Sequence, residues 1–447
     1  MKFLFRSGWG ESLAIARRVE SEGNLVRLSI VEPTAQQVGQ GLITKTRDYP
    51  GSVAWADVVV FDSNPFAMAK EAERVREAKK PCIGSSQLAG ELEHDRLFAA
   101  DVAKKAGLHT AEFKRFKGRG AWNKARDYLS EPENDGTWVW KANGDGDTVS
   151  TYVADDVPEM LRMLNYFEEL YIKDKDKPEV DFMLCERISG KEISTEAWFN
   201  GKDFYLPNNT LEKNRLFPGD LGEKTGCAGN VVWTYPTLDD CMLFNHLLKP
   251  LAKVLEGKYN GPIDVNALIE DGDEEGSEEN TPMFLEFTPR FGYDAIFTLA
   301  QLVRSDFGGL LADVAMGSSW NGKYTSDRFA GGLRLHISPY PNEEKGVAQG
   351  APIFGFEPDK IQPGVWPIEV MMGDDGEPVA SGPGGYVFVL TAEGDTPREA
   401  MEKCEPEKIK LPLMCYRNDL PEAIQKCYDE LKETGWIGAR PRRLFGR

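Results

Sequence analysis

The start of the chain constrains the fold most, because its first 32 residues read as a strand, a glycine turn, a helix and a second strand. The segment is MKFLFRSGWGESLAIARRVESEGNLVRLSIVE, and its turn contains Gly8 and Gly10. This order of elements is typical of a parallel βαβ unit. We therefore expect the chain to begin with an α/β domain.

The next segments continue this alternation of strands and helices. They are a strand in 55–66, a helix in 67–80, a strand with its turn in 81–86, and a helix in 92–107 that ends at Gly107. The pattern predicts a doubly wound domain made of roughly the first hundred residues.

The remaining segments predict an antiparallel α+β region. Strands are expected in 136–142, 181–188, 191–201 and 202–208, with a helix near 157–170. A long helix over 239–257 leads to strands in 261–269 and 283–287, joined by an acidic loop that we expect to be a solvated hairpin tip. Strands at 331–338, 365–372 and 384–394 and a helix over 421–435 follow.

Length and composition indicate a soluble protein of several domains. A chain of 447 residues is too long for one hydrophobic core and should form about three domains. Its hydrophobic share of 41% and charged share of 28% are those of globular proteins. No window approaches the roughly 18 apolar residues of a membrane helix, and the first apolar run is too short for a signal peptide. We expect a cytoplasmic protein with no membrane partner.

Cysteine usage and net charge argue against several further classes of protein. The seven cysteines are odd in number and contain no CxxC pair, which argues against a disulfide framework and a zinc site, so we expect reduced thiols. A formal charge of −19 opposes long-range attraction to nucleic acids or anionic membranes. A small phosphorylated substrate needs only a local basic pocket and stays possible.

The first glycine loop only partly matches the GxGxxG dinucleotide fingerprint. Gly8, Gly10 and a possible ribose-binding acid, Glu32, fit it, but Leu13 stands where the third glycine belongs. A phosphate or carboxylate needs only the free N–H groups at the start of the helix. We therefore expect a small anionic substrate at this loop.

The segment LEFTPRFG, residues 285–292, combines an acid, an oxygen ligand and a cation. If the strand continues, Glu286, Thr288 and Arg290 point the same way while Leu285 and Phe287 face the core. Such a face could hold a metal and a phosphate together. A solvated strand face is the alternative.

Two other segments suggest nucleotide binding. In WKANGDGDTVS, Lys141 precedes a loop with Gly144 and Gly146, which suits phosphate groups although no Walker motif follows and a tight turn is the alternative. In LCERISGKEIS, the strand end at Glu186 to Ile188 could bind an adenine edge, and Glu192 could bind ribose hydroxyls. Both carboxylates could instead be solvated strand charges.

The segment GPIDVNALI, residues 261–269, adds further oxygen ligands. It aligns Asp264 and Asn266 on one face of a strand adjacent to FLEFTPR.

The order of these motifs resembles the ATP-grasp ligases, and most closely the phosphoribosylamine–glycine ligase (glycinamide ribonucleotide synthetase) family. The matching segments, spread over nearly the whole chain, are GSSQLAGELEHDR, KANGDGDTV, ERISGKEIS, NRLFPGDLGEKTGCAG, FLEFTPRFG and GGYVFVLTAEGDTPREA. The resemblance implies an ATP-grasp fold with a doubly wound pre-grasp domain (1–107), an ATP-grasp domain (108–325) with a mobile lid at about 113–184, and a β-rich C-terminal domain (326–447). In this fold the segment 214–229 would be a long substrate loop.

The resemblance also implies roles for individual residues. Arg96 and Lys141, with Gly144 and Gly146, would hold the ATP phosphates, and Lys141 and Arg290 would act in catalysis. Glu186 and Ile188 would hold the adenine, and Glu192 the ribose. Glu286, Asn266 and Thr288 would hold Mg²⁺ or Mn²⁺. The substrates would lie against Gly8, Gly10, Thr225, Gly226 and Arg290.

Several positions depart from the family's pattern. Thr288 replaces the usual asparagine, a loss that Asn266 or Asp264 would offset, and Arg96 replaces a lysine. The family's GDPET, PNTGGMG and GPE are here GYDAI, EKTGCAG and SNP. These last three departures affect substrate motifs, so the resemblance implies ATP-dependent ligation more strongly than it implies particular substrates.

The predicted function is therefore that of an ATP-dependent, ADP-forming ligase that joins an amino acid such as glycine to an amine through an acyl phosphate. Purine biosynthesis in the cytoplasm is the expected setting, and a monomer or homodimer the expected state. The alternatives are an amino-acid ligase acting on a modified nucleotide or other acceptor, and an ATP-binding protein that has lost catalysis.

Overall fold

The computed structural model describes residues 1–144, 151–173, 180–270, 281–341, 348–382 and 384–438. The chain divides into two compact units. The first contains 1–89, 193–265 and 288–447, and the second contains 90–192 and 266–287. The predicted domain boundaries after residues 107 and 325 and the lid at 113–184 stay predictions.

The first unit begins with the predicted parallel sheet, which has the order β2-β1-β3-β4. Its strands are β1 (Lys2–Ser7), β2 (Leu25–Ile30), β3 (Val58–Phe61) and β4 (Cys82–Ile83), and its helices are α1 (Leu13–Ser21), α2 (Tyr49–Trp55) and α3 (Phe66–Glu77). Phe3 and Phe5 belong to the same core cluster as α1, whereas Leu4 belongs to the cluster of α3. Helices therefore cover both faces, which confirms the predicted doubly wound α/β start.

A larger antiparallel sheet forms the rest of the first unit's framework, in the order β16-β19-β15-β12-β11-β10. Its strands are β10 (Gly190–Phe199), β11 (Phe204–Phe217), β12 (Leu221–Thr234), β15 (Phe329–Ile337), β16 (Val365–Pro367) and β19 (Tyr386–Gly394). Strand β15 is buried along its whole length. The helices here are α9 (Ala295–Leu302), α10 (Phe307–Met316), α11 (Pro397–Glu402) and α12 (Leu420–Glu433).

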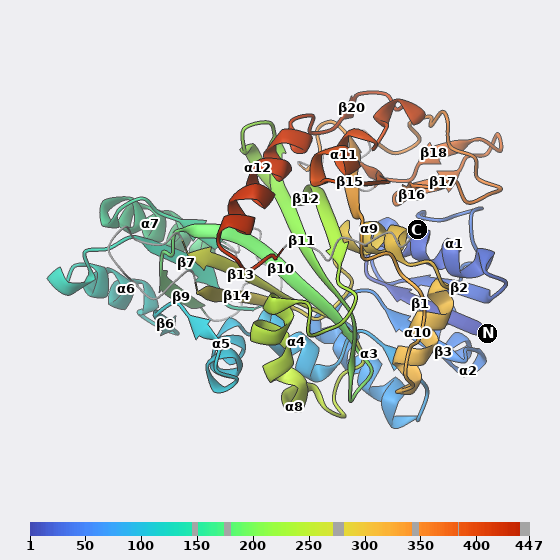
Figure 1. The fold of residues 1–447 in the computed structure, drawn as a ribbon. Helices are drawn as coiled ribbons and strands as arrows, with labels where there is room; N and C mark the ends of the chain where they lie inside the picture. The colour runs from blue at the N-terminus through green and yellow to red at the C-terminus, as the bar shows by residue number, and fades with distance from the viewer. Residues whose placement is uncertain (145–150, 174–179, 271–280, 342–347, 383, 439–447) are drawn as a thin grey trace, which may run out of the picture. The chain divides into compact units, whose positions relative to one another are not determined.

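The segment 214–229, expected as a long substrate loop, is mostly β-hairpin. Figure 1 shows β11 and β12 as two long neighbouring strands, and the pairs Lys213↔Gly229, Arg215↔Lys224 and Phe217↔Leu221 give their register. The expectation of a loop was wrong, because backbone pairing continues nearly to the turn. The predicted strand 365–372 is also divided, into β16 and β17 (Val370–Met372), and β17 pairs with β18 (Pro378–Ala380).

Two predicted helices are interrupted. The helix expected over 92–107 is α4 (Gln87–His94) and α5 (Arg96–Lys105), because the Asp95 carboxylate accepts hydrogen bonds from the N–H groups of Leu97 and Phe98 and starts a new helix. The helix expected over 239–257 is a π-helix (Phe244–Leu248), a 3₁₀ turn (Lys249–Leu251) and the short α8 (Ala252–Leu255). Pro250 lies in this stretch, and a proline cannot donate the N–H that a continuous α-helix needs.

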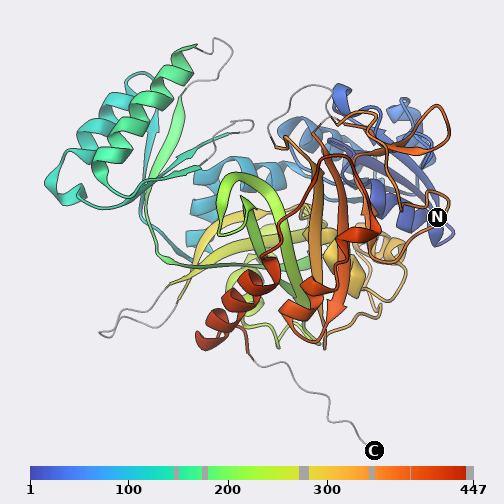
Figure 2. The ribbon, with the colours of Figure 1, turned by 90° about the horizontal axis from the view of Figure 1, so that it is seen from above.

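The second unit contains a four-stranded antiparallel sheet of order β6-β9-β7-β8. Its strands are β6 (Phe113–Lys117), β7 (Trp138–Ala142), β8 (Thr151–Val153) and β9 (Asp181–Glu186). Helices α6 (Ala121–Leu129) and α7 (Val157–Lys173) lie side by side over it (Figure 2). Stacked rings fill the layer between, with centroids 4.6 Å apart for Trp122 and Phe182 and 4.2 Å apart for Trp140 and Phe167.

Strands β13 (Gly261–Glu270) and β14 (Pro282–Thr288) are neighbours in a sheet that β14 continues by parallel pairing with β5 (His109–Thr110). Most of the predicted acidic hairpin tip lies outside the described residues. Within the described residues, no helix is both long and apolar enough to cross a membrane. All seven cysteines are free thiols, as expected.

Candidate functional site

The two cations predicted to hold phosphates lie close together in the second unit. Arg96 is the first residue of α5, and its Nη1 donates a hydrogen bond to Thr151 Oγ1 at 3.2 Å. Lys141 on β7 pairs directly with Thr151 on β8. Burial raises the pKa of the Cys185 thiol, and the positive charges of Lys141 and Arg96 both oppose this rise. The structure therefore brings both cations to one place.

The start of the predicted phosphate loop is fixed by Asn143, which sequence reasoning missed. Its Oδ1 accepts the Arg96 backbone N–H at 2.8 Å, and its Nδ2 donates to Asp181 Oδ2 at 3.2 Å. Gly144 has a φ of +118° and donates its N–H to the His94 carbonyl at 3.0 Å. Gly146 lies outside the described residues. A polar residue between a strand lysine and a glycine loop is the signal that could have identified Asn143.

The predicted adenine hinge follows β9. Glu186 ends this strand with an exposed side chain, Ile188 is half-buried, and Glu192 is exposed on β10. At Gly190 an added Cβ would lie 2.4 Å from the Ile269 carbonyl oxygen, so the hinge requires glycine for close backbone approach.

The predicted metal ligands are oxygen-bearing side chains on the neighbouring strands β13 and β14. Glu286 is exposed, and Asn266 and Thr288 are half-buried. None of these three side chains makes a hydrogen bond or ion pair with another described residue. Free oxygen donors suit a hard cation such as Mg²⁺, so the residues present fit this ion. Within the described ranges, no three His, Cys, Asp or Glu residues converge, so phosphate oxygens would have to complete the coordination.

The predicted alternation along this strand is only partly correct. Phe284 and Phe287 are buried, with 6% and 1% of their surface exposed, whereas Leu285 is only half-buried. Strand β14 ends at Thr288, so Arg290 lies beyond the strand. The prediction that Arg290 shares a strand face with Glu286 and Thr288 was therefore wrong. Pro289 follows the strand immediately, and a proline cannot continue the hydrogen-bond ladder.

Arg290 instead belongs to a group of side chains in the first unit. Its guanidinium lies 4.5 Å from the centre of the Tyr293 ring, and its Nη1 donates to the Phe291 carbonyl at 3.0 Å. A Cβ at Gly226 would lie 3.1 Å from the Tyr293 ring. Two predicted substrate residues, Gly226 and Arg290, therefore both lie against the Tyr293 ring. The hydroxyl of Thr225 donates to the Asn214 carbonyl at 3.0 Å, across the hairpin.

The first glycine loop is held by protein acceptors. Asp62 follows β3, and its Oδ1 accepts the Gly8 N–H at 3.1 Å while its Oδ2 accepts the Ser12 N–H at 3.3 Å. The Gly10 N–H donates to Ser7 Oγ at 2.8 Å. Gly10 has a φ of +95°, which favours glycine. The N–H groups of Gly8 and Gly10 thus have protein acceptors, and the binding of a small anionic substrate at this loop stays a prediction.

Glu11 is a second acid at this loop that sequence reasoning missed. Its side chain is half-buried, and its Oε2 accepts the Trp9 N–H at 3.4 Å. Burial and then the charge of Asp62 raise the pKa of Glu11 to about 7, while the charge of Arg290 lowers it. The carboxyl edge of a parallel sheet is the usual ligand position, so acids after β1 and β3 were a usable signal.

A buried ion pair fixes the start of α9, immediately after Tyr293. Asp294 accepts two hydrogen bonds from the Arg334 guanidinium, at 2.7 and 3.0 Å, and one from the Tyr386 hydroxyl. Arg334 also donates to the Tyr340 hydroxyl at 2.5 Å. Because all these partners belong to the fold, this cluster positions Tyr293 and is not itself a ligand site.

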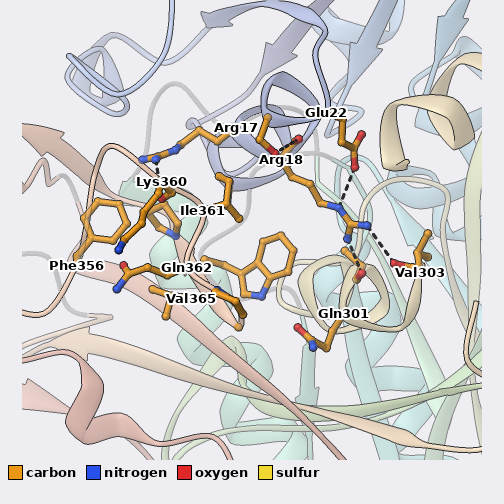
Figure 3. Close-up of a pocket in the computed structure, with 17 residues that line it drawn as sticks. Arg17, Arg18, Glu22, Gln301, Val303, Phe356, Lys360, Ile361, Gln362 and Val365 are labelled. Carbon is orange, nitrogen blue, oxygen red and sulfur yellow. Dashed lines mark hydrogen bonds and ion pairs between the residues drawn. The ribbon is translucent and has the colours of Figure 1, made fainter. Parts of the chain in front are cut away.

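A pocket of about 260 Å³ lies elsewhere in the first unit, lined by α1, α9 and residues 356–367 (Figure 3). None of the predicted site residues lines it. Arg18 donates to the carbonyls of Ala300 and Val303 at 2.5 and 3.0 Å, and Arg17 donates to the Pro358 carbonyl at 2.6 Å. These arginines join the segments around the pocket, which indicates a packing role.

Known proteins share both sequence and fold with this chain. Residues 94–294 match the family described as phosphoribosylglycinamide synthetase, ATP-grasp (A) domain. A phosphoribosylamine–glycine ligase of Caldanaerobacter subterraneus is 27% identical over 76% of this chain and 78% of its own length. One from Streptococcus suis is 25% identical over 79% of this chain and 80% of its own length.

Solved structures give the same fold. The phosphoribosylamine–glycine ligase of Thermotoga maritima covers 94% of this chain and 100% of its own, with a TM-score of 0.71 and 20% identity. The biotin carboxylase domain of Hydrogenobacter thermophilus 2-oxoglutarate carboxylase, solved with MgADP, has a TM-score of 0.63 and 15% identity, and covers 97% of this chain and 95% of its own. The predicted ATP-grasp fold and the resemblance to this ligase family are confirmed.

Proposed function

We propose that this chain, an ATP-dependent ligase with the ATP-grasp fold, joins glycine or a similar amino acid to an amine through an acyl phosphate and releases ADP. The convergence of Arg96 and Lys141 beside Thr151 is the observation that carries the proposal. Two cations at the start of a glycine loop suit a polyphosphate. Cytoplasmic purine biosynthesis is the proposed setting.

The chemistry requires activation because a carboxylate does not react with an amine at neutral pH. Transfer of the γ-phosphoryl group to the carboxylate creates a leaving group, which the amine then displaces. Arg96 and Lys141 hold the phosphates, and Arg290 stabilises the charge of the transferred group. No covalent nucleophile from the protein is required, so the cysteines have no part in this step.

Glu286, Asn266 and Thr288 would hold Mg²⁺, which when bound offsets the negative charge of the phosphates. These residues have no competing partners in the described chain. Glu186 and Ile188 are proposed to hold the adenine, and Glu192 the ribose.

The structure bears on the acceptor amine through Tyr293 and Asp294, which stand within the altered motif GYDAI. The Tyr293 ring lies against Gly226 and the Arg290 guanidinium, two residues that are proposed to contact the substrates. This observation favours a second candidate, an amino-acid ligase that uses a modified nucleotide or another amine as acceptor. A third candidate, a degenerate ATP-binding protein, follows from Thr288 and differs from both in having no turnover.

The test uses hydroxylamine as the amine. With ATP, magnesium and glycine or another amino acid, the protein should release ADP and phosphate and form the amino-acid hydroxamate. Glu286→Gln keeps the side chain's size but removes its charge, so it should abolish hydroxamate formation without changing the melting temperature. AMP and pyrophosphate as products, or no turnover with any amino acid, would contradict the proposal.

A further inference from the structure

The acidic side of the glycine loop gives the proposed ligase a residue for proton transfer. We propose that Glu11 accepts the proton of the attacking amine, an inference that rests on the proposed ligase function. A protonated amine cannot attack a carbonyl carbon, because its lone pair is occupied. A carboxylate beside the acceptor would both attract the ammonium group and remove its proton.

The position of Glu11 is fixed by contacts on both sides of the loop. Asp62, with 5% of its surface exposed, accepts the N–H groups of Gly8 and Ser12, and these bonds set the path of the backbone around Glu11. Ser63 donates its hydroxyl to Asp62 at 3.2 Å. Glu11 itself accepts a long hydrogen bond from the Trp9 N–H, at 3.4 Å. Asp62 is thus a positioning residue, whereas the Glu11 carboxylate keeps capacity for a further donor.

The two acids of the loop, Asp62 and Glu11, have pKa values that are shifted by different neighbouring groups. Burial raises the pKa of Asp62, and its hydrogen bonds, among them the one from the Gly8 N–H, oppose part of this rise. The negative charge of Asp62 then acts on Glu11, after burial, to raise the pKa of Glu11 to about 7. The Asn64 side chain, two residues after Asp62, donates to the Pro289 carbonyl at 3.3 Å, which places the chain after β3 beside Arg290. The positive charge of Arg290 lowers the pKa of Glu11. A group that titrates near neutral pH serves well as a proton acceptor.

Arg290 connects Glu11 to the reacting group. The same guanidinium that interacts with Glu11 is the one proposed to stabilise the acyl phosphate. An ammonium group attracted by Glu11 would therefore approach the carbonyl carbon beside Arg290.

Proton transfer to Glu11 comes before formation of the C–N bond. The ammonium group gives one proton to the Glu11 carboxylate and becomes a neutral amine. Its lone pair forms the C–N bond, the C–O bond to phosphate breaks, and phosphate leaves with that bonding pair. The amine nitrogen loses its second proton to the departing phosphate, and Glu11 later returns its proton to solvent.

Two amine probes separate this role from the overall reaction. Ammonium is charged at neutral pH and needs a proton acceptor, whereas hydroxylamine is already neutral. Glu11→Gln should lower the ammonium-dependent rate by about 100-fold or more, while hydroxamate formation stays within roughly twofold of wild type. The matched control, Glu77→Gln, alters an exposed acid at the end of α3 in the same unit, and should leave both rates unchanged.

The pH dependence gives a second readout. In the wild type, the ammonium-dependent rate, divided by the fraction of free amine, should change with a pKa near 7, and Glu11→Gln should remove this change. Equal loss of both rates in Glu11→Gln, a wild type that uses hydroxylamine but not ammonium, or an unchanged pH profile would each overturn the role of Glu11. A wild type with no hydroxamate formation would instead contradict the proposed ligase function.

Discussion

At the scale of single residues, Glu11 and Glu196 have similarly raised pKa values, but the physical causes differ. The pKa of each is raised to about 7. Glu196 on β10 has 6% of its surface exposed, and burial alone raises its pKa, against hydrogen bonds from Asn208 and Trp198. For Glu11, the charge of Asp62 adds to burial. Glu196 therefore affects folding, whereas Glu11 responds to charged groups at the site.

The difference predicts how stability depends on pH at Glu196. Because its pKa in the folded state lies above the ordinary value of 4.5, its contribution to stability is complete below that value and is lost as pH rises through about 7. Ionisation should cost the wild type about 3 kcal/mol of unfolding free energy at alkaline pH, and Glu196→Gln avoids this cost. Urea unfolding should show that the free energy of unfolding of Glu196→Gln rises relative to that of the wild type between about pH 5 and about pH 8.

The control is Glu402→Gln, which changes an exposed acid on α11. Its stability difference from the wild type should stay constant over the same pH range. A constant difference for Glu196→Gln as well would show that Glu196 remains charged in the folded protein.

Sequence reasoning predicted candidate site residues whose chemistry is local and missed candidates that depend on distant partners. Arg96 and Lys141 were predicted from motifs, and the structure brings them together. Asp62 was missed because its role depends on Gly8, which lies 54 residues away along the chain. The contact of Tyr293 with Gly226 likewise depends on the fold, since no local pattern joins them.

At the scale of elements, most helices and strands were predicted with the correct type, but the points where two helices are interrupted were not predicted. The order β1-α1-β2 was predicted from hydrophobic pattern and glycine positions, which are local properties. The break between α4 and α5 follows from one carboxylate, because Asp95 satisfies two N–H groups that a continuous helix would use otherwise. Apolar periodicity continues across such a break, so the pattern alone could not reveal it.

This break predicts a measurable effect of Asp95. Asp95→Ala removes the acceptor for the Leu97 and Phe98 N–H groups, at 3.2 and 3.1 Å, and should lower the unfolding free energy by about 1 kcal/mol. Because α5 begins with Arg96, the ATP concentration for half-maximal turnover should rise as well. Denaturant unfolding and ADP release measure the two effects.

Asp101→Ala is the matched control, since Asp101 is exposed within the same helix. It should change neither quantity beyond the small gain in helix propensity that alanine brings. Equal behaviour of the two variants would show that Asp95 does not cap α5.

At the scale of the whole molecule, the predicted residues separate by unit. The proposed phosphate, adenine and ribose residues, with Glu286 and Asn266, belong to the second unit, and Gly8, Gly10, Gly226 and Arg290 belong to the first. Strands β10, β13 and β14 each have residues in both units. The predicted order of motifs could not show this division, because each unit is assembled from segments that alternate along the chain.

The division of the predicted residues between the two units predicts that different substitutions will weaken ATP binding and ligation separately. Lys141→Ala removes a proposed phosphate contact in the second unit, so ATP binding should weaken by about tenfold or more. Arg290→Ala removes a charge in the first unit that acts on the transferred group, so ATP binding should stay within roughly twofold while turnover falls by at least about 100-fold. Calorimetry with ATP and magnesium measures the first property, and ADP release with saturating ATP, glycine and hydroxylamine measures the second. Lys141→Met preserves the apolar stem of the side chain and should match Lys141→Ala, which separates loss of charge from loss of packing. If Arg290→Ala weakened ATP binding as much as Lys141→Ala, then Arg290 would belong to the nucleotide site, and its proposed action on the acyl phosphate would be wrong.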